Sequence, residues 1–209
     1  MGQQLIEQAV GRGLDVTTAN VGDGCIPVGV SNRHVHLSEE HLEILFGEGF
    51  ALTKDKLLLQ GEEFAAKETV TLVGPKGVIQ KVRVLGPVRK STQVEISRTD
   101  GYTLGVMPPV LVSGQTEGSA GIVVVGSKGA VTLSQGVICA ARHVHMNDED
   151  ARRYGVADQD RVTIKIAGER GGTFTNVLVR VSHDARLELH IDTDEANAVG
   201  LKNGDVVSL

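Results

Sequence analysis

The chain has 209 residues, of which 41% are hydrophobic and 22% are charged, and its formal net charge is −5 at pH 7. This length and composition fit one large or two small globular domains and exclude wholesale disorder. A mildly acidic chain lacks the basic face that a nucleic-acid backbone requires, so we expect no nucleic-acid partner. No apolar run approaches the ~20 residues of a membrane span, so we expect no membrane partner.

The N-terminus lacks the basic start and apolar core of a secretory signal, and two cysteines do not form a disulfide framework. We therefore expect a reducing, cytoplasmic compartment. Cys139 lies in an apolar run, 137–140, which favours a small buried side chain. A nucleophilic Cys139 would need a neighbour that lowers the pKa of its thiol.

The 26 glycines and six aromatic residues indicate short strands and tight turns rather than a helical bundle. Acidic stretches predict two short helices, which begin after the capping residues Ser38 and Asn147 and end at Gly47 and Gly155. Hairpins are predicted at 69–73 with 78–84, at 122–125 with 130–133 and at 162–166 with 173–181, and single strands at 93–97 and 188–192. The Ser- and Gly-rich segment 113–121 is the stretch most typical of a linker.

These elements form an internal repeat. The tetrapeptide Arg-His-Val-His occurs at 33–36 and again at 142–145, and a helix, a hairpin and a strand follow each copy. The chain is therefore predicted to be mainly β with short helices, in two pseudo-repeated modules. Halves of about 90 residues suggest small barrels or sandwiches.

Alternation along a strand places the two histidines of each tetrapeptide on one face. Their Cα atoms are roughly 6.5–7 Å apart, so both imidazoles can reach one ion. Aligning the later strands places Glu95 opposite His190, which supplies a third ligand to each pair. Three protein ligands with an open position are typical of catalytic zinc, whereas a lone His-x-His is more often two surface histidines. The predicted ligand sets are His34, His36 and Glu95, and His143, His145 and His190.

Arg89 lies in a predicted turn six residues before Glu95. A guanidinium at this position can hold an anionic substrate through a bidentate contact, although a solvated turn arginine is the default interpretation. The same two interpretations, an anion-binding residue or a solvated side chain, apply to Lys56, Arg83 and Arg98.

The segment from Pro27 to Ser38, with Ser-Asn-Arg-His-Val-His at its centre, resembles the PduL-type phosphate acyltransferases, and so do residues 69–77, 93–100, 142–146 and 187–198. The resemblance covers about residues 26 to 200. It implies an enzyme that interconverts propanoyl-CoA or acetyl-CoA plus phosphate with acyl phosphate plus CoA. It also implies two small pseudo-repeated β-barrel domains with a dinuclear zinc site between them.

The resemblance further implies that each ligand set holds one zinc ion and that Arg89 binds phosphate. It places the contacts to CoA, a substrate, at Ser31, Lys56, Arg83 and Asn197. It divides the chain into an N-terminal extension at 1–25, a first barrel domain formed by 26–32 and 141–209, and a second barrel domain formed by 33–140. From the same resemblance we expect a homodimer.

Members of this family inside bacterial microcompartments carry an amphipathic extension that docks on the shell. The apolar residues Leu5, Ile6, Ala9, Val10 and Leu14 form a helical stripe, which two glycines weaken. We therefore expect residues 1–20 to bind a shell protein inside a microcompartment of propanediol or ethanolamine degradation; the alternative is a frayed terminus. The chain departs from the family at 60–65, where Gln-Gly-Glu-Glu-Phe-Ala replaces Gln-Pro-Gly-Gln-Phe-Ala.

The expected mechanism is direct transfer in a ternary complex, without a covalent enzyme intermediate. One alternative is a zinc-dependent hydrolase of small substrates, because a His-x-His strand also begins the amidohydrolase barrels. Those barrels need about 250 residues of alternating strands and helices. The other alternative is a non-catalytic, metal-binding, shell-associated module, in which Arg89 would be dispensable.

Overall fold

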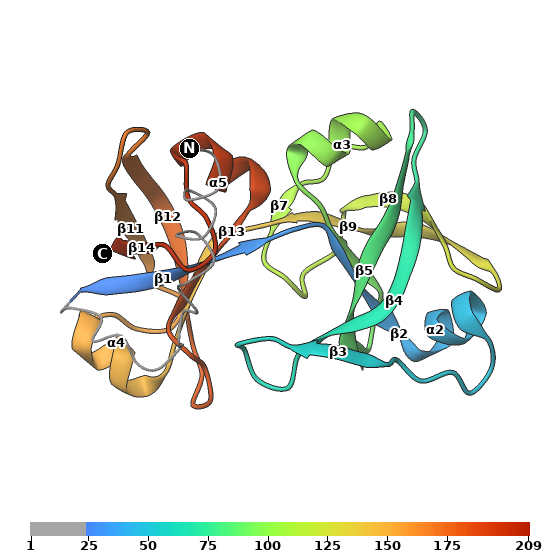
Figure 1. Cartoon of the computed structure of the whole chain (residues 1–209), viewed down its shortest axis with the longest axis horizontal. Helices are drawn as coiled ribbons and strands as arrows, with labels where there is room; N and C mark the ends of the chain where they lie inside the picture. Colours follow the sequence, from blue (N-terminus) through green and yellow to red (C-terminus); the bar gives the residue numbers. More distant parts are fainter. Residues whose placement is uncertain (1–23) are drawn as a thin grey trace, which may run out of the picture.

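The structure is a computed structural model that describes residues 24–209. The predicted shell-binding segment, residues 1–20, lies outside the described residues. Short strands predominate, and the described residues contain four short helices. Figure 1 shows two bodies side by side, each built around its own sheet. The predicted fold class, mainly β with short helices in two small barrels, is confirmed.

One body is a closed barrel of six strands that come from both ends of the described chain. The last strand pairs with the first, so Cys25 lies opposite Ser208. Around the barrel the strands are β1 (Cys25–Ser31), β13 (Glu188–Asp192), β10 (His143–Met146), β12 (Gly172–Val181), β11 (Arg161–Ile166) and β14 (Val206–Ser208).

The other body is also a ring of six strands, because β8 pairs with both β4 and β9. Two short strands, β3 (Lys54–Leu57) and β7 (Val110–Leu111), extend this sheet. The ring consists of β4 (Phe64–Val73), β5 (Val78–Arg89), β2 (His34–Ser38), β6 (Gln93–Glu95), β9 (Ala130–Ala140) and β8 (Ala120–Val125).

The predicted hairpins are confirmed as the β4–β5, β8–β9 and β11–β12 pairs. The linker prediction for 113–121 is wrong, because this segment joins β7 to β8 within one sheet system. The two helices predicted from capping residues are also confirmed. Each of the two further helices follows the strand that carries Glu95 or His190. The helices are α2 (Glu39–Phe46), α3 (Arg98–Leu104), α4 (Asp148–Tyr154) and α5 (Thr193–Val199).

The two barrels repeat the same pairing pattern. Strand β2 lies between β5, which is parallel to it, and β6, which is antiparallel; β10 has the same relation to β12 and β13. The register is equivalent too, since His34 is opposite Glu95 and His143 is opposite His190. The repeated tetrapeptide therefore occupies the same place in both barrels.

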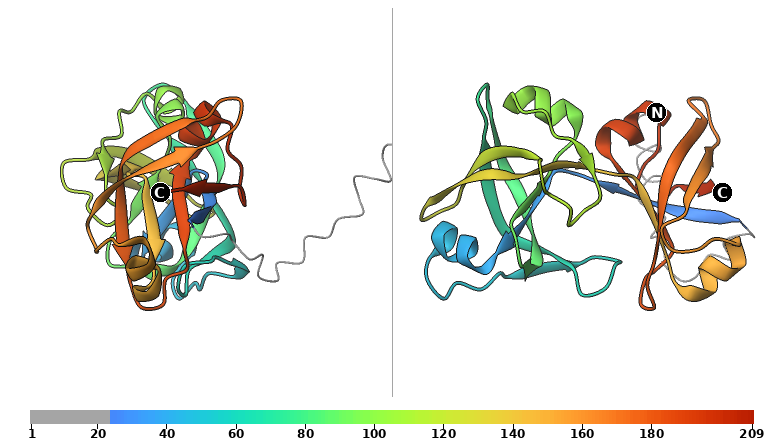
Figure 2. Two further views of the ribbon diagram at one scale, coloured as in Figure 1. Left: turned by 90° about the vertical axis from the view of Figure 1, so that its left-hand side faces the viewer. Right: turned by 180° about the vertical axis from the view of Figure 1, so that it is seen from behind.

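Two strands are exchanged between the barrels. Strand β1 pairs with β13 and β14 of the first barrel but leads directly into β2 of the second. Strand β9 pairs with β6 and β8 of the second barrel but leads directly into β10 of the first. Both strands cross from one body to the other in Figure 1 and in the rear view of Figure 2. Each Arg-His-Val-His segment therefore begins where the chain crosses between barrels.

Each barrel encloses its own hydrophobic core. Val35 and Val144, the middle residues of the two tetrapeptides, have no exposed surface and belong to different cores. Because side chains alternate along a strand, the valine anchors the strand in the core while the histidines on either side face the opposite way. Core packing thus orients both histidine pairs.

The Gly-Pro-Lys-Gly turn of the β4–β5 hairpin packs against the end of α3. The backbone nitrogen of Lys76 donates a hydrogen bond to the carbonyl of Leu104 at 3.0 Å. A Cβ atom added at Gly74 would lie 2.2 Å from that same carbonyl oxygen. Only glycine therefore permits this close approach between hairpin and helix.

We expect Gly74→Ala to destabilise the protein by about 1–3 kcal/mol, the usual cost of forcing an extra carbon into a packed contact. Urea unfolding followed by circular dichroism measures this change. Gly172→Ala is the matched control, because an added Cβ there meets nothing within 4 Å. Equal stability of the two variants would contradict the packing argument.

Candidate active site

The first cluster joins β2 to β6. His34 Nε2 lies 3.4 Å from Glu95 Oε2, and His36 Nε2 lies 3.9 Å from Glu95 Oε1. All three side chains are buried, and their candidate ligand atoms lie within 4.8 Å of one another. Two imidazoles and one carboxylate at these separations can converge on a single divalent cation.

Hydrogen bonds orient the members of the first cluster. His34 Nδ1 lies 2.8 Å from the carbonyl oxygen of Asn32, which can only accept, so Nδ1 carries the proton and Nε2 is left as the ligand atom. Glu95 Oε1 accepts hydrogen bonds from Gln93 Nε2 at 2.6 Å and from Ser113 Oγ at 2.8 Å. These contacts hold the carboxylate toward the imidazoles.

The second cluster joins β10 to β13. His143 Nδ1 lies 2.8 Å from the carbonyl oxygen of Ala141, which mirrors the contact of His34 with Asn32. His143 Nε2 then lies 3.1 Å from His145 Nε2, and the ring of His190 is within 5.1 Å of both other rings, centre to centre. The three imidazoles therefore also converge on one point.

A carboxylate also lies beside the second cluster: it belongs to Glu188, two residues before His190 on β13. Glu188 Oε2 lies 2.6 Å from His190 Nε2. By the repeat, Glu188 corresponds to Gln93 and His190 corresponds to Glu95. Gly29 makes room for this arrangement, since a Cβ there would lie 2.9 Å from the Glu188 carboxylate. Each cluster thus carries one carboxylate, but at exchanged positions.

Most of the pKa values favour the forms that bind metal. The exception is His34, because burial alone would lower its pKa but the adjacent Glu95 carboxylate raises it overall. Burial, helped by neighbouring cationic groups, lowers the pKa of His36 to about 3 and that of His143 to about 4, so these rings are neutral at pH 7. Burial and the same kind of repulsion also lower the pKa of His145. Burial alone would raise the pKa of Glu95, but the adjacent His34 and His36 imidazoles lower it overall, so the carboxylate is ionised.

The donor sets fit zinc. Neutral imidazoles and an ionised carboxylate are the forms that coordinate Zn²⁺. Within residues 24–209, His36 Nδ1 is the buried side-chain polar atom that has no hydrogen-bond partner. A buried ring with an unpaired nitrogen is costly unless an ion or solvent satisfies it. The His34, His36 and Glu95 set and the His143, His145 and His190 set could each hold one ion.

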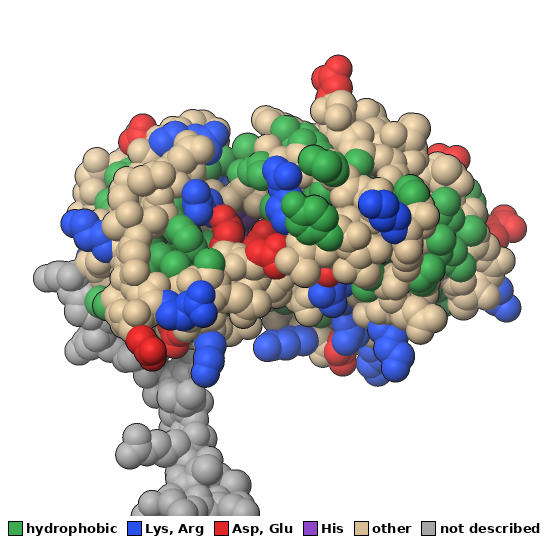
Figure 3. All heavy atoms as spheres, turned by 90° about the horizontal axis from the view of Figure 1, so that it is seen from above, with side chains coloured by type: hydrophobic (Ala, Val, Ile, Leu, Met, Phe, Trp, Pro, Cys, Tyr) green, Lys and Arg blue, Asp and Glu red, His purple; other side chains and the backbone are tan. Residues whose placement is uncertain are grey.

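The two clusters face the junction between the barrels. Glu95 of the first cluster is close enough to raise the pKa of His143 in the second, although burial and His190 lower that pKa more strongly. Figure 3 shows a histidine side chain at the bottom of a hollow between the two bodies, with acidic and basic side chains at its rim. A substrate in this hollow could contact both clusters.

Arg89 lies at the end of β5, next to the first cluster. Its Nη1 donates a hydrogen bond to Ser113 Oγ at 3.4 Å, and Ser113 in turn donates to Glu95. Its Nη2 lies 2.6 Å from Glu63 Oε1. The predicted phosphate-binding residue is therefore linked to a candidate metal ligand through one side chain.

The four residues predicted to contact CoA are spread over both barrels. Ser31 ends β1, and its Oγ lies 3.4 Å from His34 Nδ1, so the structure brings it to the first cluster. Arg83 is in register with His34 on β5, but its Nη1 donates to the Ala66 carbonyl at 2.6 Å. The two others are exposed and have no described contact with either cluster: Lys56 on β3 and Asn197 on α5.

The arginine of each tetrapeptide ties the ligand strand to a helix. Arg33 binds both carboxylate oxygens of Asp100, at 2.9 Å from Nε to each oxygen. Arg142 pairs with Glu195 at 3.2 Å. Each acid is also the third residue of its helix and closes that helix's capping box. The start of α3 or α5 is thereby fixed against the strand that carries the histidines.

Several residues that surround the clusters were not predicted from the sequence. Gln93 and Glu188 carried a usable signal, because each lies two residues before a predicted third ligand and so shares its face. Ser113 carried no such signal, because it begins the segment mistaken for a linker. Gln60 lies in the segment between β3 and β4, and its buried Nε2 reaches the other barrel, 3.3 Å from Glu188 Oε2.

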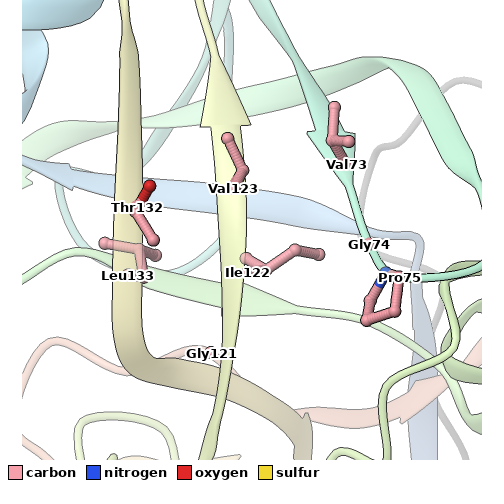
Figure 4. A pocket seen from close by; sticks show the side chains of 8 residues that line it. All are labelled: Val73, Gly74, Pro75, Gly121, Ile122, Val123, Thr132 and Leu133. Atoms are coloured by element: carbon pink, nitrogen blue, oxygen red, sulfur yellow. The ribbon is translucent and has the colours of Figure 1, made fainter.

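A separate pocket lies on the outside of the second barrel, between the Gly74–Pro75 turn and strands β8 and β9 (Figure 4). Apart from the hydroxyl of Thr132, the side chains that line it are apolar: Val73, Pro75, Ile122, Val123 and Leu133. No titratable group lines this pocket, so it offers no acid, base or metal ligand.

Comparison with known proteins identifies the family of the chain. The family model described as phosphate propanoyltransferase matches residues 27–202. A phosphate propanoyltransferase of Thermotoga maritima is 60% identical over 183 residues, which are 87% of each chain. One from Rhodobacter capsulatus is 51% identical over 98% of this chain and 96% of its own, and one from Salmonella typhimurium is 48% identical over 97% and 95%.

These relatives are acyltransferases by name. The chain belongs to the phosphate propanoyltransferase family, and its activity is that of a phosphate acyltransferase. This membership selects the transferase over the hydrolase and over the non-catalytic module.

Among residues 24–209, no helix has the length and apolarity needed to cross a membrane.

Cys139 is the buried side chain that its apolar surroundings predict. It is 6% exposed, and its Sγ donates a hydrogen bond to Asp192 Oδ2 at 3.3 Å. Burial and the negative charge of Asp192 raise the pKa of the thiol to about 12. A thiol that stays protonated near neutral pH is a poor nucleophile.

We expect Cys139→Ala to retain most of the transferase activity, and we expect rapid-quench experiments on the wild type to detect no acylated enzyme. In the wild type, a thiol reagent at pH 8 should modify the partly exposed Cys25 first. Loss of activity to background in a folded Cys139→Ala protein would contradict a non-covalent mechanism.

Proposed function

We propose that this chain interconverts propanoyl-CoA or acetyl-CoA plus phosphate with the acyl phosphate plus CoA, at a site that holds two zinc ions. The observation that carries this proposal is the pair of three-ligand clusters at the barrel junction, one of them linked to an arginine. Hydrogen phosphate attacks the thioester carbonyl, the carbon–sulfur bond breaks, and the phosphate proton goes to the CoA sulfur. Atoms and charge balance without an oxidant or a covalent enzyme intermediate.

In this proposal, one zinc ion binds His34, His36 and Glu95, and the other binds His143, His145 and His190. Bound zinc would supply a Lewis acid to polarise the thioester carbonyl and to stabilise the leaving thiolate. Gln93 and Ser113 hold Glu95 in its ligand orientation through the hydrogen bonds described above. The Asn32 and Ala141 carbonyls hold His34 and His143 in the tautomer that presents Nε2.

Arg89 binds phosphate in this proposal. Its planar guanidinium can donate two parallel hydrogen bonds to phosphate oxygens, which orients the nucleophile as well as offsetting its charge. Ser31 would contact the part of CoA closest to the first cluster; its Oγ lies 3.4 Å from His34 Nδ1, which supports this role. The remainder of CoA would be contacted by Lys56 on β3 and Arg83 on β5, two strands of the second barrel that β4 separates, and by Asn197 on α5.

Two further proposals concern assembly. The apolar stripe at residues 1–20 would dock on a microcompartment shell protein, and the chain would act as a homodimer inside that compartment. A fusion of residues 1–20 to a fluorescent protein tests the first proposal by its localisation with shells. Sedimentation of the full chain tests the second.

We expect CoA release from propanoyl-CoA or acetyl-CoA, followed with a thiol reagent, to require phosphate. A chelator should abolish the release, and added zinc should restore it, because both clusters lose their ions. Equal release without phosphate would indicate a thioesterase and would contradict the proposal.

The purified enzyme should contain two zinc ions per chain by elemental analysis, and His190→Ala should contain about one. The matched control is His41→Ala, since His41 bonds to Thr92 rather than to either cluster.

We expect Arg89→Ala to raise the KM for phosphate by about tenfold or more and to lower kcat. A tenfold rise in KM corresponds to the loss of a pair of charge-assisted hydrogen bonds. Steady-state kinetics at saturating acyl-CoA measure the effect. Lys90→Ala is the matched control, because Lys90 is the adjacent exposed cation. An unchanged phosphate dependence in Arg89→Ala would remove this residue from the phosphate site.

A further inference from the structure

The guanidinium assigned to phosphate is already held by a carboxylate of the same chain. Arg89 Nη2 lies 2.6 Å from Glu63 Oε1, and the two side chains are only 31% and 35% exposed. A carboxylate in this position accepts from the same N–H groups that a phosphate oxygen would use. Glu63 therefore stands where an anionic ligand of Arg89 would stand.

The backbone that carries Glu63 is firmly placed. The Glu63 carbonyl accepts a hydrogen bond from the Leu58 nitrogen at 2.9 Å, and the Glu63 nitrogen donates to the Gln60 carbonyl at 3.3 Å. The Gln60 side chain bonds across to the other barrel, donating to the Arg186 carbonyl at 2.9 Å. Motion that frees Arg89 is therefore expected in the Glu63 side chain rather than in the segment.

The chain is also fixed on the other side of Glu63. Phe64 is in register with Gly86 of β5, and a Cβ added at Gly86 would lie 2.2 Å from the Phe64 ring. The backbones that carry Glu63 and Arg89 are thus held together by direct packing of their neighbours. Because Glu63 keeps about a third of its side chain exposed, its carboxylate has a path into solvent.

We propose that Glu63 occupies the phosphate position of Arg89 in the substrate-free enzyme, and that phosphate or the phosphoryl group of the acyl phosphate displaces it. This inference rests on the proposed role of Arg89. The incoming dianion brings more charge and more acceptor oxygens than the carboxylate it replaces. Glu63 then turns toward solvent, away from the bound anion. The affinity for phosphate is accordingly set by competition with an internal anion, and Glu63 is a residue that determines it.

The test is the binding of inorganic phosphate to the zinc-loaded full chain, without acyl-CoA, by isothermal titration calorimetry. We expect Glu63→Gln to bind phosphate about two- to fivefold more tightly, the range that corresponds to losing a partly exposed ion pair. Glu63→Asp should also bind more tightly, because it keeps the charge but is one methylene too short to reach Arg89. Glu62→Gln is the matched control: its exposed carboxylate lies one residue away and should leave the affinity unchanged.

A double-mutant cycle with Arg89→Gln completes the test, since it measures whether Glu63 acts through Arg89. We expect Glu63→Gln to have no effect on phosphate binding once Arg89 is replaced. Unchanged or weaker binding by Glu63→Gln in the native background would overturn the inference. So would Glu63→Asp behaving like wild type, or a gain that persists without Arg89, because either result indicates general charge repulsion.

The outcomes separate this inference from the proposed function. If Arg89→Gln alone leaves phosphate binding unchanged, the assignment of Arg89 to phosphate fails. If Arg89→Gln weakens binding but Glu63→Gln does not strengthen it, the assignment of Arg89 stands and the competition by Glu63 is refuted. Thermal melting of each variant checks that the fold is retained.

Discussion

The register of two antiparallel strand pairs is the constraint on which the site depends. His34 is opposite Glu95 on β2 and β6, and His143 is opposite His190 on β10 and β13. A shift of one residue in either pair would turn the third ligand to the other face. The buried valine between each pair of histidines opposes such a shift, because Val35 and Val144 are packed in separate cores. Core packing therefore determines ligand geometry.

The exchange of β1 and β9 explains why the two clusters share one hollow. Each barrel is closed by a strand that continues into the ligand strand of the other barrel. The clusters are consequently tied to the junction by the chain itself. Further contacts between the barrels reinforce this junction, such as the hydrogen bond that the Thr99 nitrogen donates to Asp194 at 2.8 Å. An arrangement of this kind suits a reaction in which two substrates meet between rigid walls.

A connected set of polar side chains links Arg89, the residue proposed to bind phosphate, to the candidate metal ligands. Glu63, Arg89, Ser113 and Glu95 form an unbroken chain of hydrogen bonds, and Gln93 adds a branch to Glu95. Displacement of Glu63 by phosphate would thus alter a network that ends on a candidate zinc ligand. If the proposed function holds, this arrangement would couple phosphate binding to the orientation of the Glu95 carboxylate.

Local patterns in the sequence determined the helices after Ser38 and Asn147, the hairpins, and the pairing of Glu95 with His190 by repeat. These features depend on neighbours within a few residues, or on an alignment of two similar segments. The tertiary structure alone decided which barrel each crossing strand completes, that Ser113 lies beside Glu95, and that Glu63 meets Arg89. Such contacts join residues 18 and 26 positions apart, or opposite ends of the chain. Their partners are chosen by the closure of two barrels, which no local periodicity encodes.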